Sequence, residues 1–356
     1  MKMGQPTMNR NYNLDYLRGM AALGIMIYHY TLWAVGALSS DTFLKKHGVY
    51  GVSIFYILSG LTLYLVYYDK MQPNKEDVLL FIKKRFLRIF PLLWLATIAT
   101  IFIATKTPET LDVVLNLTGL FGFIKWGSYV AVGAWSIGNE LVFYVFFPFF
   151  ILFTRSYKLL MVMLSFIIFL LFLYFTFIKL NPNVPISRQW VDYVNPLNQV
   201  FFFLIGYLIG AFLKTVTINN SITILFLVFG LSIFAFYPVD GDAINIVTGF
   251  NRLVLTFSCI LICIGFYKLT IKVPYIIHKP LAILGEASYS VYLLHPILYY
   301  LIGLTFPFFN EHSIYFSTKG RIIISAIITI IVSYFVYTYF EKHFMRKGAS
   351  KKVELI

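Results

Sequence analysis

The chain is dominated by ten apolar segments, most of them close to the length at which a helix crosses a lipid bilayer. A hydrocarbon core about 30 Å thick requires about 20 apolar residues in a helix, and backbone groups in lipid must be hydrogen-bonded within the helix itself. Only 12% of the 356 residues are charged, against roughly 25% in soluble domains. We therefore predict an all-α polytopic membrane protein, with about ten transmembrane helices in one bundle that forms a single domain over residues 1–356. The predicted spans are residues 14–37, 50–68, 89–105, 131–153, 159–178, 196–213, 221–237, 250–267, 283–306 and 321–340.

The distribution of basic residues predicts how this bundle is oriented. The net charge is +14, and 19 of the 29 Lys and Arg residues lie in the two ends of the chain and the loops on the same side, whereas 8 lie in the opposite loops. Because Lys and Arg are enriched in cytoplasmic loops, we predict that both termini are cytoplasmic. The basic excess then marks orientation in the lipid membrane, and a nucleic-acid partner is not needed to explain it.

The first apolar segment carries titratable residues on one face. Residues 20–38 contain His29 and no charged side chain, and Arg18 precedes His29 by eleven positions. Eleven helical positions amount to three turns plus about 20°, so the two side chains share a face and lie roughly 16 Å apart. Asp15 belongs to the same stripe. Ionisable groups within lipid usually face a bundle interior or a cavity, which favours a functional site; a buried structural histidine is the alternative.

The densest basic stretch is F-I-K-K-R-F-L-R-I-F-P, residues 81–91. Lys84 and Arg88 are four positions apart and Arg85 and Arg88 are three apart, so one helical face gathers them. Interleaved aromatic and aliphatic residues are typical of a lipid-headgroup anchor. The paired N–H donors of an arginine guanidinium also bind phosphate oxygens well. The residues leave both interpretations open: a membrane anchor, or a site for a phosphate-bearing cofactor.

The fourth span opens with G-A-W-S-I-G-N-E-L-V-F-Y, in which Ser136, Glu140 and Tyr144 are successive i,i+4 neighbours. An unpaired carboxylate in lipid is costly, so Glu140 needs a partner, for which Arg18, His29, Arg252 or a proton are candidates. With Ser136 and Asn139 beside it, we favour a functional site over a structural ion pair. Counted along the helices, His29 lies roughly 22 Å from one membrane face and Ser136 roughly 8 Å from the other, so the two heights are compatible in a core about 30 Å thick.

Three other segments contain residues of interest. In G-E-A-S-Y-S-V-Y-L-L-H-P, His295 precedes a proline, where we expect a kink that frees backbone groups; a structural role for this histidine is favoured. Arg252 lies near the outer end of its span, where its long side chain would snorkel to the interface. Cys259 and Cys263 do not have the spacing of a metal site or disulfide framework and indicate helix packing. The small residues of G-V-S-I-F-Y-I-L-S-G, residues 51–60, predict close packing against the first helix.

Together these motifs resemble those of membrane-bound acyltransferase family 3, whose members O-acylate surface carbohydrates and some small molecules. The resemblance covers nearly the whole length. Its parts, in chain order, are L-D-Y-L-R-G-M-A-A with His29, G-V-S-I-F-Y-I-L-S-G, R-F-L-R-I-F-P, W-S-I-G-N-E and S-Y-S-V-Y-L-L-H-P.

The resemblance implies an O-acyltransferase of a bacterial inner membrane that uses cytoplasmic acyl-CoA, with acetyl-CoA preferred on family grounds. It implies that His29 is catalytic, that Arg85 and Arg88 form the cofactor-side motif, and that Arg18 is the arginine that precedes the histidine. Ser136 and Glu140 match W-S-x-x-x-E. Some members carry a further C-terminal esterase-like domain outside the membrane. This sequence ends at Ile356, so we expect transfer to finish within the membrane domain or to pass to a separate protein.

These residues suggest a mechanism in which neutral His29 is the general base for a sugar hydroxyl on a cell-surface or exported polysaccharide or glycolipid. Glu140 would orient His29, Ser136 and Asn139 would donate hydrogen bonds, and Arg18 would be a deeper alternative site for the cofactor. An acyl-His29 relay fits equally well, and no metal is required. The rival classes are a transporter or flippase of a sugar or glycolipid and a non-catalytic partner in polysaccharide assembly.

Overall fold

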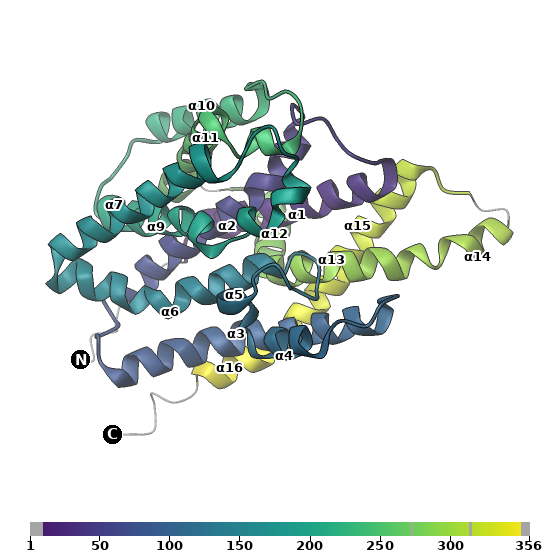
Figure 1. The fold of residues 1–356 in the computed structure, drawn as a ribbon, viewed down its shortest axis with the longest axis horizontal. Coiled ribbons are helices and arrows are strands. Elements are labelled where there is room, and N and C mark those ends of the chain that lie inside the picture. The colour runs from purple at the N-terminus through teal and green to yellow at the C-terminus, as the bar shows by residue number, and fades with distance from the viewer. Residues whose placement is uncertain (1–9, 272, 313–314, 350–356) are drawn as a thin grey trace.

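A computed structural model describes residues 10–271, 273–312 and 315–349 of the chain. Throughout these residues the regular structure is helical, without a strand (Figure 1). Eight of the described helices are long and apolar enough to cross a membrane. The predicted all-α polytopic class is therefore confirmed in outline.

The longer helices follow the predicted spans. They are α1 (Tyr12–Val35), α2 (Phe43–Tyr67), α3 (Lys75–Ile103), α6 (Trp135–Ser156), α7 (Lys158–Tyr174), α9 (Pro196–Leu213), α10 (Asn220–Phe236), α11 (Gly249–Lys268), α13 (Ser288–Gly303) and α15 (Thr318–Phe335). Shorter helices join them: α4 (Thr110–Thr118), α5 (Phe121–Ile124), α8 (Trp190–Tyr193), α12 (Tyr275–Glu286), α14 (Phe306–Glu311) and α16 (Lys342–Ala349). Two π-helical turns, Phe175–Lys179 and Val336–Glu341, and two 3₁₀ turns, Ile186–Gln189 and Ala243–Ile246, complete the regular structure of the described residues.

The structure corrects the predicted elements in three places. The eight candidate spans do not include α1, which carries Asp15 and Arg18 near its start, or α10, which has 17 residues. The predicted span 283–306 is broken at Ala287 into α12 and α13. The predicted loop between α3 and α6 contains two short helices, α4 and α5.

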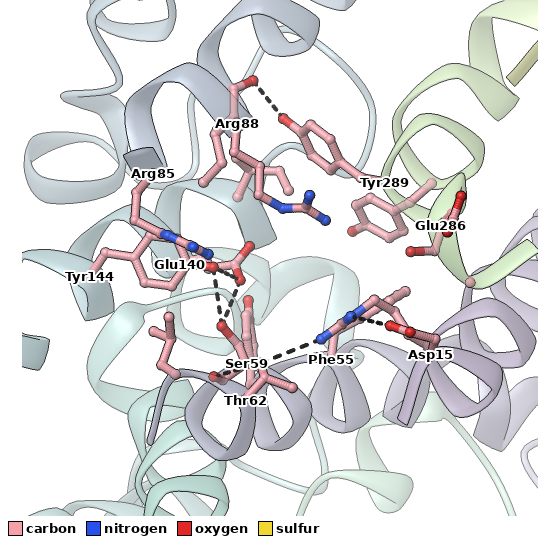
Figure 2. Close-up of a pocket in the computed structure, with 18 of the residues that line it drawn as sticks. Asp15, Phe55, Ser59, Thr62, Arg85, Arg88, Glu140, Tyr144, Glu286 and Tyr289 are labelled. Atoms are coloured by element: carbon pink, nitrogen blue, oxygen red, sulfur yellow. Dashed lines mark hydrogen bonds and ion pairs between the residues drawn. The ribbon is translucent and has the colours of Figure 1, made fainter. Parts of the chain in front are cut away.

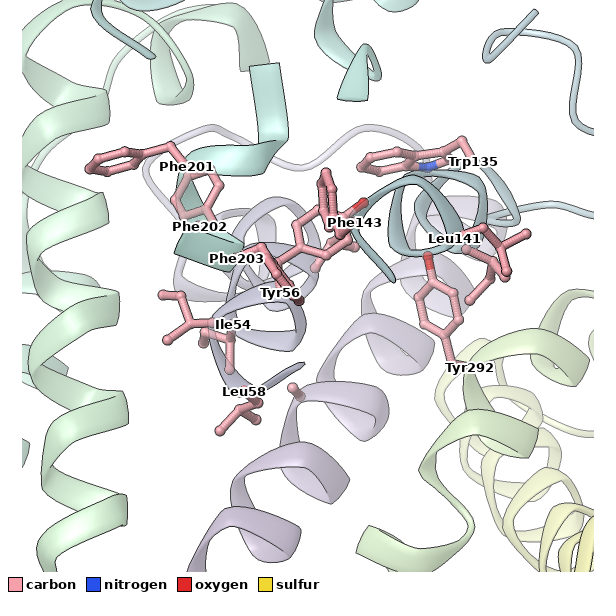
Figure 3. Close-up of a cluster of buried hydrophobic side chains, with 14 of the residues drawn as sticks. Ile54, Tyr56, Leu58, Trp135, Leu141, Phe143, Phe201, Phe202, Phe203 and Tyr292 are labelled. Carbon is pink, nitrogen blue, oxygen red and sulfur yellow. The ribbon is translucent and has the colours of Figure 1, made fainter. Parts of the chain in front are cut away.

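Helix α2 lies at the centre of the bundle and packs against both α1 and α9. A Cβ atom on Gly51 would lie 2.7 Å from the Ile25 side chain of α1, whereas one on Gly60 would overlap the backbone of Phe203 in α9. The predicted contact with the first helix is thus correct for the start of the segment, and its end packs on α9. Figure 3 shows the aromatic core that α9, α2 and α6 share, in which Tyr56 and Phe143 meet edge to face with ring centroids 5.2 Å apart.

Two further contacts bring the ends of the described chain together. Helices α1 and α12 cross where Gly19 faces Gly285, with room for no Cβ on either residue. This close crossing places Glu286, the next residue, beside Arg10 at the start of the described chain. At the C-terminal end of the described chain, α16 packs along α3 (Figure 1). One end of the bundle therefore combines the N-terminal segment, the basic stretch of α3 and α16.

Candidate functional site

A cavity of about 380 Å³ opens at this end of the bundle, between α1, α2, α3, α6, α12 and α13. Its volume is within the range of roughly 300–1,000 Å³ that is usual for small-molecule sites. Four arginines line it: Arg10, Arg18, Arg85 and Arg88. In Figure 2 the side chains of Arg85, Arg88, Glu140 and Asp15 surround the cavity from three different helices.

Arg85 and Arg88 reach the cavity from α3 without a carboxylate partner among the described residues. Arg85 donates to the hydroxyl of Tyr67 at 3.1 Å, and its Nε is buried without a hydrogen-bond acceptor. Its guanidinium also lies over the rings of Tyr67 and Tyr144, at 5.5 and 5.7 Å from their centroids. Arg88 contacts the sulfur of Met345 in α16 at 3.5 Å. Since guanidinium groups bind phosphate through pairs of hydrogen bonds, this pair has the donor capacity for a phosphate-bearing ligand.

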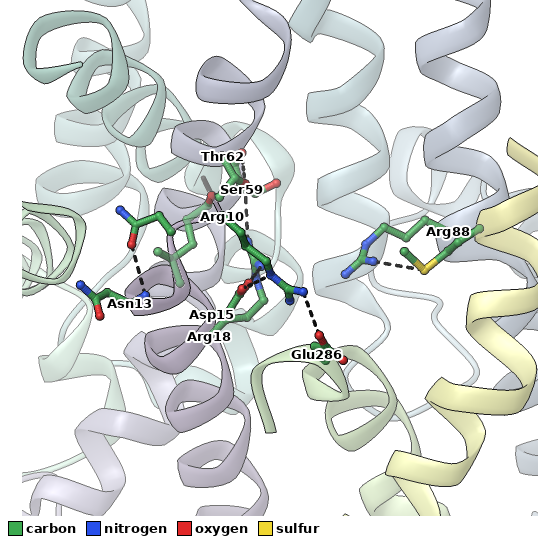
Figure 4. Close-up of polar contacts among 11 residues, drawn as sticks. Arg10, Asn13, Asp15, Arg18, Ser59, Thr62, Arg88 and Glu286 are labelled. Carbon is green, nitrogen blue, oxygen red and sulfur yellow. Dashed lines mark hydrogen bonds and ion pairs between the residues drawn. The ribbon is translucent and has the colours of Figure 1, made fainter. Parts of the chain in front are cut away.

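The other two arginines are held by carboxylates at the mouth of the cavity (Figure 4). Arg10 pairs with Asp15 at 2.6 Å and with Glu286 at 2.8 Å. Arg18 pairs with Asp15 at 3.3 Å and donates to Thr62 at 3.5 Å. Glu286 also pairs with Lys342 of α16 at 3.5 Å. Arg18 thus lines the cavity as predicted, but much of its charge is already compensated.

Glu140 lies on the cavity wall and does not contact His29. Its carboxylate accepts hydrogen bonds from Ser59 of α2, at 2.8 Å, and from the hydroxyl of Tyr144 one turn along α6. The i,i+4 neighbours predicted from the sequence therefore do share a face. The expected role for Glu140 in orienting His29 is wrong, because Nδ1 of His29 contacts His295 instead.

The inner end of the cavity is closed by Tyr292 and Ser136. Tyr292 of α13 donates to the carbonyl oxygen of Gly133 at 2.9 Å, and its hydroxyl lies 2.7 Å from Ser136 Oγ. Ser136 also contacts the Gly133 carbonyl at 3.0 Å. Gly133 has φ +84°, a conformation that a side chain would strain. This turn holds two hydroxyls together at the end of the cavity.

His29 is not among the residues that line the cavity. The side chain of His295 separates it from Tyr292, which closes the inner end. Nδ1 of His29 is 2.9 Å from Nε2 of His295, and the ring of His295 is 6.2 Å from that of Tyr292. Trp33 lies nearly parallel to both imidazoles, with its ring centroid 5.3 Å from that of His29 and 6.0 Å from that of His295. The His29 ring is partly exposed, and its neighbours are aromatic. His295 and Tyr292 lie between His29 and Ser136, and the equal height of His29 and Ser136 in the membrane stays a prediction.

Two other residues singled out in the sequence have structural contacts. The amide of Asn139 is fully buried away from the cavity and donates to the hydroxyl of Tyr56, at 3.2 Å, and to the carbonyl of Val194, at 3.1 Å. Arg252 does not snorkel to an interface: it is buried, donates to Asn198 Oδ1 at 2.8 Å and lies over the Phe172 ring. In the described part of the chain no three His, Cys, Asp or Glu side chains are placed to hold a metal ion.

Sequence reasoning missed Ser59 and the closing function of Tyr292. Ser59 lies in a stretch noted only for small residues, and nothing local indicates that it faces an acid on α6. Tyr292 lies four positions after Ser288 and three before His295, which is a helical spacing, but its partner Gly133 lies 159 positions away.

One comparison with known proteins finds a match. A protein-family model, described as an acyltransferase domain of acyltransferase family 3, matches residues 11–338. No curated protein and no solved structure matches the chain. The family match spans helices α1 to α13 of the cavity and ends within the π-helical turn before α16, whose Met345 also lines the cavity. Together with the apolar helices, it shows that the chain belongs to acyltransferase family 3 and is a membrane acyltransferase.

Proposed function

We propose that this protein is an O-acyltransferase that moves an acyl group, preferably acetyl, from cytoplasmic acyl-CoA to a hydroxyl of a cell-surface or exported polysaccharide or glycolipid. The protein would act in a bacterial inner membrane with both termini in the cytoplasm. His29 is the general base. The observation that supports this most directly is the cavity itself, which has at its α3 wall two arginines without a carboxylate partner in the described part of the chain, and two hydroxyls at its inner end.

Each part of the cavity has a chemical task in this proposal. Arg85 and Arg88 bind the phosphates of the donor, so that its pantetheine arm and thioester extend towards Ser136 and Tyr292. Glu140 keeps the wall polar through Ser59 and Tyr144. The hydroxyls of Ser136 and Tyr292 both donate to the Gly133 carbonyl; once released from it, they would donate to the oxyanion that develops when the thioester carbonyl is attacked.

His29 carries out the proton transfers. It accepts the proton of the acceptor hydroxyl as the oxygen attacks the thioester carbonyl. When the carbon–sulfur bond breaks, His29 returns that proton to the departing thiolate, so the products are an ester and a free thiol. Because Tyr292 lies between the cavity and His295, its side chain has to leave the Gly133 carbonyl for the two substrates to meet.

The test uses the purified protein in detergent with labelled acetyl-CoA and a polysaccharide acceptor. We expect acceptor-dependent release of free CoA and label on the acceptor. His29→Ala should reduce this transfer by a factor on the order of 10²–10⁴, the usual contribution of a general base, without lowering expression. The matched control is His312→Ala, at an exposed site in the loop after α14.

Two results would contradict the proposal, and a third would change its mechanism. An intact thioester in the presence of protein and acceptor would indicate a carrier instead of an enzyme. Full activity of His29→Ala would reject the base assignment. Label found on His29 before acceptor is added would replace direct transfer by an acyl-enzyme relay.

A further inference from the structure

The His29 imidazole has one hydrogen-bonding partner among the described residues, and that partner is a second histidine. Nδ1 of His29 lies 2.9 Å from Nε2 of His295, and the two rings are nearly parallel with centroids 5.1 Å apart. His295 is fully buried. A neutral imidazole has one donor and one acceptor nitrogen, so the hydrogens on the two rings must be placed consistently.

The second nitrogen of His295 sets the direction of this hydrogen bond. Nδ1 of His295 lies 2.7 Å from the carbonyl oxygen of Tyr292 and 3.2 Å from that of Val291. A carbonyl oxygen can only accept, so Nδ1 carries the hydrogen and Nε2 of the neutral ring is left with its lone pair. His29 must therefore donate through Nδ1. Its own Nε2 is then unprotonated, which is the form that a general base requires.

The local sequence explains why the Tyr292 carbonyl is available. In an α-helix the N–H of residue i+4 would bond to it, but that residue is Pro296, which has no N–H. Helix α13 continues through the proline to Gly303, and the His295 ring supplies the missing donor. The dipeptide His295-Pro296 thus provides both the ring and the backbone acceptor that fixes its tautomer.

The surroundings favour neutral rings. Neither histidine forms an ion pair with a described carboxylate, and an unpaired buried charge is costly. On the outer side of His29, Lys45 donates to the hydroxyl of the adjacent Tyr28 at 2.9 Å, which places a cation near the pair.

We infer that His295 is a positioning residue: it holds His29 in the tautomer whose Nε2 accepts the proton of the acceptor hydroxyl. The inference rests on the proposed function, since it completes the role given there to His29. When Nε2 of His29 is protonated, its Nδ1–H still donates to the lone pair of His295, whose own N–H is anchored on the Tyr292 carbonyl. The carbonyl dipole therefore stabilises the imidazolium until the proton passes to the thiolate, much as an orienting group does in other catalytic sites.

Three substitutions of His295 separate this role from simple packing. In His295→Gln the side-chain oxygen falls near the position of Nε2 and still accepts from His29. In His295→Asn the shorter amide still reaches the Tyr292 carbonyl but no longer reaches His29. His295→Leu fills the volume without either bond, and His312→Gln is the control on an exposed histidine.

We expect His295→Gln to keep kcat within about 10-fold of the wild-type value, while His295→Asn and His295→Leu lose about 100-fold or more. KM for acyl-CoA should stay unchanged, because the arginines that bind the donor lie elsewhere. Equal kcat values for the Gln, Asn and Leu variants would overturn the inference. So would an Asn variant that is more active than the Gln variant.

A spectroscopic measurement tests the tautomer without relying on activity. In protein labelled with ¹⁵N at histidine, the resonances of His29, assigned by comparison with His29→Gln, should show a protonated Nδ1 and an unprotonated Nε2. In His295→Leu this preference should be lost. A proton on Nε2 of His29 in the wild-type protein would overturn the inference. Absence of transfer by the wild-type protein would overturn the proposed function, and the nitrogen spectrum would still decide the tautomer.

Discussion

At the scale of single residues, Arg85 and Arg88 differ from the other arginines of the cavity in what they contact. Arg10 and Arg18 are held by Asp15 and Glu286, whereas the guanidinium of Arg85 meets a phenol and aromatic rings. Arg88 contacts only a thioether sulfur in hydrogen-bonding range among the described residues. Two cations without a carboxylate partner among the described residues are what the proposed function, with its anionic donor, requires.

The first residue-scale prediction decides between phosphate binding and lipid anchoring. Arg85→Ala combined with Arg88→Ala should weaken acyl-CoA binding by about 100-fold or more, because hydrogen bonds to charged groups contribute about 1.5–3 kcal/mol each. Equilibrium binding of acyl-CoA to the purified protein measures this.

The matched control removes the same charge from the same stretch. Lys83 and Lys84 neighbour the two arginines on α3 but do not line the cavity. Lys83→Ala with Lys84→Ala should leave the affinity for acyl-CoA unchanged. Equal losses in both double variants, or none in either, would support a headgroup anchor instead.

At the scale of elements, the close contact between α2 and α9 fixes the wall that carries Ser59 and Thr62. A Cβ on Gly206 would overlap the carbonyl oxygen of Ile57, and one on Gly60 would overlap that of Phe203. The two helices therefore approach backbone to backbone, as small residues allow in membrane bundles. Moving them apart would shift Ser59 relative to Glu140, to which it donates across the bundle.

This packing predicts a difference between two glycines. Gly206→Ala should destabilise the protein by about 1–3 kcal/mol through overpacking, despite the better helix propensity of alanine. Gly303→Ala, at the end of α13 where a Cβ would meet no atom within 4 Å, should be neutral or stabilising by up to about 1 kcal/mol. Thermal unfolding in detergent compares the two. A Gly206→Ala variant as stable as Gly303→Ala would contradict the packing described here.

The positions of the long helices could be predicted from the sequence, because hydropathy determines them. The contacts between helices could not be predicted in this way. Residues 196–213 were predicted as a span and form α9. The break at Ala287 and the short helices α4 and α5 were missed, because a window the length of a span does not resolve shorter elements. The pairing of His29 with His295 joins residues 266 positions apart. Periodicity places a side chain on a helix face but does not show which helix that face meets.

At the scale of the whole molecule, both ends of the described chain meet at the cavity. Arg10 and Lys342 share Glu286 as a partner, and α16 packs along α3. Residues 1–9 and 350–356 themselves lie outside the described residues. The same end carries most of the basic loops, so the positive-inside rule predicts that the cavity opens to the cytoplasm, where acyl-CoA is available.

Cysteine labelling tests that orientation. Glu76→Cys, at the start of α3, should react with an impermeant maleimide in inside-out vesicles only, and Asn183→Cys, in the loop after α7, in right-side-out vesicles only. The native Cys259 and Cys263 are fully buried and serve as an internal unlabelled background. The reversed pattern would place the mouth of the cavity outside the cell and exclude a cytoplasmic donor.

The bond between Tyr292 and the Gly133 carbonyl has a consequence for the protein in the absence of acceptor. In the proposed mechanism, while that bond is closed, a donor held in the cavity is separated by the Tyr292 ring from His29, the proposed general base. Water reaching His29 from the far side then has no thioester to attack. The proposed mechanism therefore predicts slow hydrolysis of the activated acyl group without acceptor, and rapid cleavage of the thioester once the molecule to be acylated is bound.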